Sequence, residues 1–184
     1  MSAEPVDTSV PAPVRLRPVL EGDLDVLDRY LTDPEATGAF EWYGWSDPNV
    51  WRRRWADDGL LGTDRSMLMV CSDTETHGFV AWWKVVTSRS SFCWEIGINL
   101  LPEARGRGIG TEAQRRLVRY LFAHTQAVRI QAGTEVDNRA EQRALEKAGF
   151  TREGVMRSVT FRDGAWRDGV LYSVLRDEAM DQGR

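Results

Sequence analysis

The feature that most constrains the fold of this chain is a glycine-rich segment between a strand pattern and a helix pattern. Its sequence is Arg105-Gly106-Arg107-Gly108-Ile109-Gly110. Residues 92–101 before it alternate as a strand does, and residues 111–124 after it place apolar side chains at helical spacing. Glycines let the backbone curl so that the free N–H groups of a helix start converge on an anion, and the two arginines add positive charge. The segment predicts a phosphate or pyrophosphate site, although tight packing of a helix entry would also require glycines.

Two common nucleotide-binding motifs fit this segment poorly. A P-loop requires Gly-Lys-Ser or Gly-Lys-Thr after its spacer, and the segment contains neither. The dinucleotide fingerprint requires Gly-x-Gly-x-x-Gly, whereas Gly106, Gly108 and Gly110 give Gly-x-Gly-x-Gly. Glu135 does lie about 25 residues further on, near a predicted strand end, as that fold requires. However, several strands precede the segment, and the roughly 50 residues that remain are too few for the rest of a dinucleotide fold.

The rest of the pattern predicts an α/β domain of the α+β type. Strands are predicted at residues 14–17, 66–72, 78–87, 92–101, 128–136, 155–161 and 169–175. Helices are predicted at residues 23–33, 48–59, 111–124 and 139–148. Asp33-Pro34 is a stop signal for the first helix, and Asp163-Gly164 lies in a predicted hairpin turn between the last two strands. Runs of strands followed by strand–helix alternation indicate a mixed sheet with helices on its faces.

Composition limits the classes of partner. The chain has 184 residues and a formal net charge of -4, so we expect one domain with a sizeable core and no general attraction to nucleic acid or membrane. No apolar run reaches the roughly 20 residues that span a bilayer, and residues 1–13 lack the apolar core of a signal peptide. The cysteines and histidines show no metal-ligand spacing, so we expect no metal. We therefore expect a cytoplasmic protein with a flexible tail at 1–13, a domain at 14–178 and a C-terminal tail at 179–184.

Several motifs resemble the GNAT superfamily of acyl-CoA-dependent N-acetyltransferases. Arg105-x-x-Gly108-x-Gly110 resembles its Q/R-x-x-G-x-G/A motif, and residues 138–150 are similar to its second motif. Residues 153–157 and 163–168 look like the RimJ/RimL branch, which includes ribosomal-protein N-terminal acetyltransferases. The resemblance covers about residues 14–178. It implies a GNAT-like fold with a central mixed, mostly antiparallel sheet and helices on both faces.

The resemblance implies acetyl-CoA as the acyl donor and gives each motif a part in holding it. The backbone N–H groups of the turn would bind the coenzyme A pyrophosphate, and the preceding strand would pair with the pantetheine arm as a pseudo-strand. Asn138 would hydrogen-bond the donor near that arm. Arg143 would reach a phosphate, or it would only be a solvated arginine. The implied turn residues are Arg105, Gly106, Arg107, Gly108, Ile109, Gly110 and Thr111, and the implied strand residues are Ile98, Asn99 and Leu100.

The resemblance also implies direct attack of a neutral amine on the thioester. This reaction needs a base for the ammonium, hydrogen bonds to the tetrahedral oxyanion and a proton for the leaving thiolate. Glu95, on the strand beside the expected thioester, is the predicted base, or else it only binds the ammonium or an arginine. Many relatives carry a tyrosine or a serine as proton donor at the positions of Leu145 and Glu141, so neither usual donor is present. Tyr172 is a remaining candidate, unless it belongs to the core; water or a backbone N–H are others.

An aromatic cluster, Phe40-Glu41-Trp42-Tyr43-Gly44-Trp45, is the candidate acceptor site. The resemblance places the first two helices and the final hairpin around the acceptor. Glu41, Trp42 and Trp45 could bind an amine by charge and cation–π contact. The two tryptophans could equally serve packing, and Trp51, which lies at helical spacing with another tryptophan, is predicted to be core.

Two classes of function follow from these patterns. The first is an acyl-CoA-dependent N-acyltransferase, with acetyl as the expected group. Its acceptor would be a primary amine of a small molecule, an antibiotic-like natural product or a protein N-terminus. The second is a catalytically silent acyl-CoA-binding module, which the missing tyrosine and serine keep open. A homodimer is compatible with the resemblance.

Overall fold

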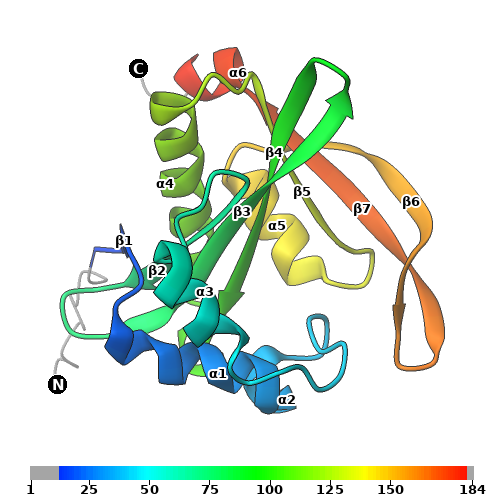
Figure 1. The fold of residues 1–184 in the computed structure, drawn as a ribbon. Helices are drawn as coiled ribbons and strands as arrows, with labels where there is room; N and C mark the ends of the chain where they lie inside the picture. Colours follow the sequence, from blue (N-terminus) through cyan, green and yellow to red (C-terminus); the bar gives the residue numbers. More distant parts are fainter. Residues whose placement is uncertain (1–12, 182–184) are drawn as a thin grey trace, which may run out of the picture.

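A computed structural model describes residues 13–181 of the chain. It contains one seven-stranded sheet in the order β1-β2-β3-β4-β5-β7-β6 (Figure 1). The strands are β1 (Arg15–Arg17), β2 (Arg65–Cys71), β3 (Thr76–Ser88), β4 (Ser91–Leu100), β5 (Arg129–Glu135), β6 (Thr151–Arg162) and β7 (Ala165–Leu175). The α-helices are α1 (Leu24–Thr32), α2 (Pro34–Thr37), α3 (Val50–Asp58), α4 (Ile109–His124), α5 (Arg139–Lys147) and α6 (Arg176–Asp181), with 3-10 turns η1 (Glu21–Asp23) and η2 (Pro102–Ala104).

The sheet is mixed and mostly antiparallel, as predicted. Every neighbouring pair of strands is antiparallel except β4 and β5. These two parallel strands are paired only at Trp94 with Ile130 and at Glu95 with Gln131. By contrast, β3 pairs with β4 over nearly the whole length of β4. After Glu95 and Gln131 no further pairing joins β4 to β5, and we call the space between them the wedge.

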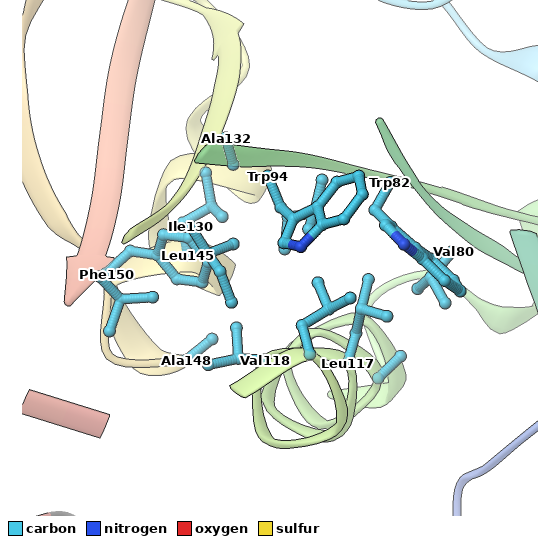
Figure 2. Packing of buried hydrophobic residues seen from close by; sticks show 14 of the residues in the cluster. Val80, Trp82, Trp94, Leu117, Val118, Ile130, Ala132, Leu145, Ala148 and Phe150 are labelled. Carbon is cyan, nitrogen blue, oxygen red and sulfur yellow. The ribbon is translucent and has the colours of Figure 1, made fainter. Parts of the chain in front are cut away.

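Two hydrophobic clusters place the helices on the two faces of the sheet. Side chains along β2 alternate between them, because successive strand residues point to opposite faces: Leu68 and Val70 enter the larger cluster, while Met67 and Met69 enter the smaller one. In the larger cluster α4 and α5 cover one face of the sheet. Its members include Trp82, Trp94 and Ile130 from the strands, Leu117 and Val118 from α4, Leu145 from α5, and Ala148 and Phe150 after α5 (Figure 2). In the smaller cluster Leu24 and Leu27 of α1 and Trp51 and Trp55 of α3 cover the other face, which includes Ala81 of β3.

Helix α2 was not predicted. The sequence Asp33-Pro34 ends α1, as expected, but it also starts the next helix. The Asp33 carboxylate accepts a hydrogen bond from the Glu35 N–H at 3.0 Å, and Pro34 fits the first helical turn. The cap stabilises a short helix, which brings the segment after it beside the wedge.

The C-terminal end also differs from the prediction. Helix α6 extends to Asp181 and so occupies part of the predicted tail at 179–184. The Glu178 carboxylate accepts a hydrogen bond from the Leu175 N–H at 2.9 Å, which satisfies a backbone donor where the helix begins. Neither α6 nor any other helix between residues 13 and 181 is long and apolar enough to cross a membrane. Residues 1–12 of the predicted N-terminal tail lie outside the described residues.

The β6–β7 hairpin is confirmed, but it is longer than predicted. Its turn holds Asp163 at φ +50° and Gly164 at φ +72°, the two positive angles that a tight hairpin turn requires. The pairing of the strands shifts in register between Arg152 and Gly154 and between Met156 and Thr160. Such bulges break the alternation on which strand prediction depends, and the predicted strands left out residues 151–154 of β6 and 165–168 of β7.

Candidate active site

A cleft of about 920 Å³ opens at the wedge between β4 and β5. It is lined by residues 95–100 of β4, residues 132–134 of β5, the glycine-rich turn with the start of α4, and the first turns of α5. Thr37 at the end of α2, and residues 38–41 and Tyr43 after it, also line the cleft. Because β5 stops pairing with β4 after Glu95, the β4 backbone on this side is open to a ligand that carries amide groups.

The glycine-rich turn has the backbone shape that an anion site requires. Gly106 and Gly108 have φ angles of +73° and +78°, which other residues adopt only with strain. Gly108 is the N-cap of α4, and no side chain caps this helix start. A Cβ atom at Gly106 or Gly108 would meet no atom within 4 Å, whereas one at Gly110 would lie 3.5 Å from the Leu100 side chain. The first two glycines therefore leave room in front of the helix start, and Gly110 lets α4 approach β4.

Arg105 is placed differently from the prediction. Its guanidinium donates hydrogen bonds to main-chain carbonyls at the end of β4 and in α2. These are the carbonyls of Leu100 at 2.9 Å, Ala36 at 2.5 Å and Thr37 at 3.3 Å. Gly38, with φ +88°, permits this approach because a Cβ there would lie 2.9 Å from Arg105 Nη1. Arg105 lines the cleft, but its hydrogen bonds tie α2 to the glycine-rich turn.

The other predicted cofactor residues divide into two groups. Thr111, Asn138 and Arg143 line the cleft together with the predicted strand residues 98–100. Arg107 and Ile109 do not: the Arg107 side chain donates to a carbonyl at the surface, and the Ile109 side chain is buried in the larger cluster. Only the backbone of these two residues is in a position to serve the anion site.

Glu95 lies where β4 and β5 separate, and it lines the cleft. Its register partner Gln131 donates a hydrogen bond from Nε2 to Glu95 Oε2 at 2.8 Å. The Cys93 thiol in turn donates to Gln131 Oε1 at 3.4 Å. Side chains of both strands therefore fix the orientation of the Glu95 carboxylate. Gln131 was missed because its role depends on the strand pairing, which the sequence does not reveal.

A second carboxylate, for which no role was predicted, lines the cleft from α5. Glu141 Oε1 accepts a hydrogen bond from Nε2 of Gln114, which is 1% exposed on α4. Loss of hydration raises the pKa of Glu141 to about 7; the Gln114 hydrogen bond opposes this shift, and the negative charge of Glu41 adds to it. One signal could have revealed this pair: Gln114 is a polar residue on the apolar stripe of α4 that carries Leu117 and Leu121.

Glu41 lines the cleft from the segment after α2. Its side chain is open to solvent, yet the surrounding protein removes enough hydration to raise the pKa of Glu41 to about 7. The negative charge of Glu135 adds to this shift, and the positive charge of Arg162 opposes it. Two cleft carboxyl groups, those of Glu41 and Glu141, therefore titrate near neutral pH.

The predicted acceptor tryptophans do not line the cleft. Trp42 and Trp45 contact each other edge to face with ring centroids 5.2 Å apart, and Trp45 is 76% exposed. From the same segment, Phe40 and Tyr43 line the cleft instead. Trp51 packs against the smaller cluster, as predicted, and it also reaches the cleft.

Tyr172 lies in the core rather than in the cleft. Its side chain is 0% exposed, and its hydroxyl donates a hydrogen bond to Glu146 of α5 at 3.1 Å. Val170, Tyr172 and Val174 alternate along β7 into the larger cluster. This placement argues against the proton-donor role that was considered for Tyr172.

A buried ion pair fixes the β6–β7 hairpin beside the cleft. Arg162 Nε and Nη2 donate to the two carboxylate oxygens of Glu135, each at 2.8 Å, and the two side chains are 9% and 7% exposed. The Arg162 guanidinium also lies over the Phe40 ring, 5.8 Å from its centroid. The pair therefore joins β6 and β5 to the segment that carries Phe40 and Glu41.

Replacing Glu135 with glutamine should lower the free energy of unfolding by about 1–3 kcal/mol, because a buried guanidinium loses its charged partner. Urea unfolding followed by tryptophan fluorescence measures this loss. Asp64→Asn is the matched control, since it breaks the exposed Lys84–Asp64 pair at 3.4 Å and should cost less than about 1 kcal/mol. Equal losses of unfolding free energy in the two variants would show that the buried Arg162–Glu135 pair stabilises the fold no more than an exposed pair does.

The family model described as "Acetyltransferase (GNAT) domain" matches residues 14–151 of the chain. The match includes β1 to β5, the glycine-rich turn, α4 and α5. It therefore covers the elements that form most of the cleft.

Two curated relatives are similar over parts of their sequences. "Probable N-acetyltransferase YjcK" of Bacillus subtilis (strain 168) is 32% identical over 111 residues, which are 60% of this chain and 61% of the relative. The ribosomal protein uS5-alanine N-acetyltransferase of Escherichia coli (strain K12) is 28% identical over 102 residues, which are 55% of this chain and 52% of that protein. The chain thus spans less than two thirds of the length of either relative.

A solved structure has the same fold over nearly its whole length. The crystal structure of spermidine N-acetyltransferase from Vibrio cholerae in complex with CoA and spermine has a TM-score of 0.78 to this chain at 18% sequence identity. The likeness covers 91% of this chain and 98% of that chain. At this identity it concerns the fold alone.

Proposed function

Since the chain belongs to the acetyltransferase (GNAT) domain family, we propose that it is an acyl-CoA-dependent N-acyltransferase that transfers acetyl from acetyl-CoA to a primary amine. One observation carries the proposal: the cleft runs along β4 from an uncapped, glycine-bearing helix start to a fixed carboxylate at the point of the wedge. At about 3.3 Å per residue, the strand from Glu95 to Leu100 spans roughly 16 Å. The cleft, which we also call the slot, therefore presents three features in order along β4: phosphate-binding groups, open strand backbone and a base.

The slot suits acetyl-CoA in three places. The N–H groups of residues 106–111 would bind the pyrophosphate, supported by the positive φ angles of Gly106 and Gly108 and by the uncapped start of α4. Residues 98–100 would pair with the amides of the pantetheine arm. Asn138 and Arg143 line the same slot from α5, where they would contact the arm and a phosphate.

The reaction begins when Glu95 takes a proton from the bound ammonium, directly or through water, and leaves a neutral acceptor amine. The amine nitrogen attacks the thioester carbonyl carbon and forms the C–N bond, while strand N–H groups near residues 98–100 stabilise the oxyanion. The nitrogen then gives up its second proton to water in the cleft. The C–S bond then breaks, and its electron pair stays on the coenzyme A sulfur. Gln131 serves by holding the Glu95 carboxylate toward the slot.

The acceptor is proposed to be a cationic amine before it is deprotonated. Glu41, Glu95 and Glu141 all line the cleft, and the aromatic rings of Phe40 and Tyr43 offer cation–π contacts. The acceptor classes are a small-molecule amine, an antibiotic-like natural product and a protein N-terminus. The similarity to the uS5-alanine enzyme supports a RimJ/RimL-like branch and a protein N-terminus, while the likeness to the spermidine enzyme supports a small polyamine. A homodimer and a cytoplasmic location stay predictions.

A catalytically silent acyl-CoA-binding module is the second candidate. Two observations favour it: Leu145 occupies the position where many relatives have a tyrosine, and Tyr172 is buried in the core. Both candidates require acetyl-CoA binding, so only turnover separates them.

Acetyl-CoA at about 100 times its Kd should stabilise the protein by about 2.7 kcal/mol and raise the Tm by roughly 5–10 °C. NAD at the same concentration should leave the Tm unchanged. Thiol release should appear only when a primary amine is added, and a panel of polyamines, aminoglycosides and peptides with free N-termini identifies the acceptor. Binding of acetyl-CoA without thiol release across that panel would favour the silent module, and absence of binding would contradict both candidates.

A further inference from the structure

The proposed reaction leaves one proton transfer without a residue. Breaking the C–S bond produces a thiolate, which leaves more readily when a nearby acid protonates it. Glu95 is already engaged as the base, Tyr172 is in the core, and Leu145 has no proton to give. The proton therefore has to come from another group, and α5 lines one side of the cleft.

Glu141 lies on that side. It precedes Leu145 by one helical turn on the same face of α5, and both residues line the cleft. Its backbone N–H donates to the Asn138 side chain at 3.2 Å, which fixes the start of the helix and with it the position of Glu141. We infer that Glu141 is the catalytic acid that protonates the coenzyme A sulfur, an inference that rests on the proposed N-acyltransferase function.

The buried partner of Glu141 suits a group that gains and loses a proton. Gln114 Nε2 donates to Glu141 Oε1 at 2.5 Å, as a carboxylate requires. Gln114 Oε1 is buried and has no hydrogen-bond partner among residues 13–181. Rotation of the amide by half a turn would bring this oxygen to the carboxyl group, where it can accept the O–H of a protonated Glu141. Gln114 can thus hold both forms of the acid.

The surroundings keep Glu141 partly protonated at neutral pH. Loss of hydration raises its pKa to about 7; the Gln114 hydrogen bond opposes this and the charge of Glu41 adds to it. An acid with a pKa near the working pH transfers protons efficiently. Tyr43 also faces the cleft and stays neutral near pH 7, because burial raises its pKa. The other charged side chains that line the cleft are Glu41, Arg65, Glu95, Arg105, Arg143 and Lys147.

Glu95 and Glu141 transfer different protons in the proposed reaction. The ammonium gives one proton to Glu95 before the attack, and the nitrogen gives a second proton to water after the C–N bond forms. When the C–S bond breaks, its electron pair goes to sulfur and the proton of the Glu141 carboxyl group follows it, so the donor leaves as a free thiol. Glu95 then holds an extra proton and Glu141 lacks one, and exchange with water in the open cleft restores both. The net change is one amide, one thiol and one released proton from one ammonium and one thioester.

Glu141→Gln tests the inference, since glutamine keeps the size and the Gln114 hydrogen bond but cannot transfer a proton. We expect kcat at pH 6 to fall about 100-fold or more, with the KM for acetyl-CoA changed less than about twofold. In the wild type, kcat should fall as pH rises through about 7, because the required acid form is lost; this limb should vanish in Glu141→Gln and persist in Glu141→Asp. Glu146→Gln is the matched control on the same helix, outside the cleft, with near wild-type kcat expected.

Four results would overturn the inference. Unchanged kcat with a raised KM for the acceptor would mean that Glu141 binds the acceptor cation. A reduced kcat that keeps the falling limb would mean that another group is the acid. Wild-type kinetics in Glu141→Gln, with an active wild type, would remove Glu141 and leave the N-acyltransferase intact. If the wild type binds acetyl-CoA but acetylates nothing, the proposed function fails, and this inference fails with it.

Discussion

Gly108→Trp is expected to abolish acetyl-CoA binding while the protein stays folded. The side chain would project into open space in front of the α4 start, where the pyrophosphate is proposed to bind. Hydrogen bonds to a charged group contribute about 1.5–3 kcal/mol each, so losing two or three of them weakens binding by at least about 150-fold. Strain at φ +78° adds about 1–2 kcal/mol of destabilisation, which the fold should tolerate. Isothermal titration calorimetry measures the affinity, and circular dichroism checks the fold.

Gly59→Trp is the matched control for that experiment. Gly59 has φ +65°, ends α3 and would also place a Cβ in open space, but it does not line the cleft. The control therefore carries the same strain and bulk and should bind acetyl-CoA with near wild-type affinity. Wild-type affinity in Gly108→Trp would rule out the turn as the pyrophosphate site.

Glu95→Gln should lower kcat by about 100- to 10,000-fold without weakening acetyl-CoA binding, because it removes the general base and keeps the hydrogen bond to Gln131 possible. The loss should be largest at low pH, where most of the acceptor is ammonium. It should shrink as the pH approaches the pKa of the amine, where neutral acceptor is abundant. Steady-state rates from pH 5.5 to 9.5, with saturating acetyl-CoA, measure this dependence.

Glu75→Gln makes the same chemical change at an exposed position in the turn before β3 and should leave the rate unchanged. Two outcomes would remove Glu95 as the base. One is a rate that differs from the wild type by the same factor at every pH. The other is an unchanged kcat with a higher KM for the acceptor, which would assign Glu95 to acceptor binding.

The sequence predicted the parts of the fold that depend on local periodicity. The helix of α4, the strand of β4 and the glycine turn between them were found because helical spacing, alternation and glycine each leave a local pattern. The same kind of pattern marks Tyr172, whose neighbours two positions away on β7 are both buried valines. Helix α2 and the full β6–β7 hairpin escaped prediction, because a cap restarts one and bulges interrupt the other.

The candidate site was less predictable, because it depends on contacts between distant segments. Arg105 looked like a phosphate ligand from its neighbours, but carbonyls more than 60 residues earlier in the chain bind its guanidinium. The segment after α2 lines the cleft, yet only the fold decides that Phe40 rather than Trp42 turns inward. From the sequence, Glu141 was noted only as a position where many relatives carry a serine. Its hydrogen bond to Gln114 joins two helices that are distant in the sequence, so no local pattern predicts it.

Because β4 and β5 pair at only two residue positions, the sheet consists of two antiparallel halves. One half contains β1 to β4 and the other contains β5 to β7. The backbone cannot set the distance between the halves beyond that point. That distance is instead maintained by the larger cluster, to which Trp82 and Trp94 of one half, Ile130 of the other, and Leu117 and Val118 of α4 all belong (Figure 2). The volumes of these buried side chains therefore determine the width of the cleft. Buried residues that touch no ligand become determinants of which donor and which acceptor the slot can admit.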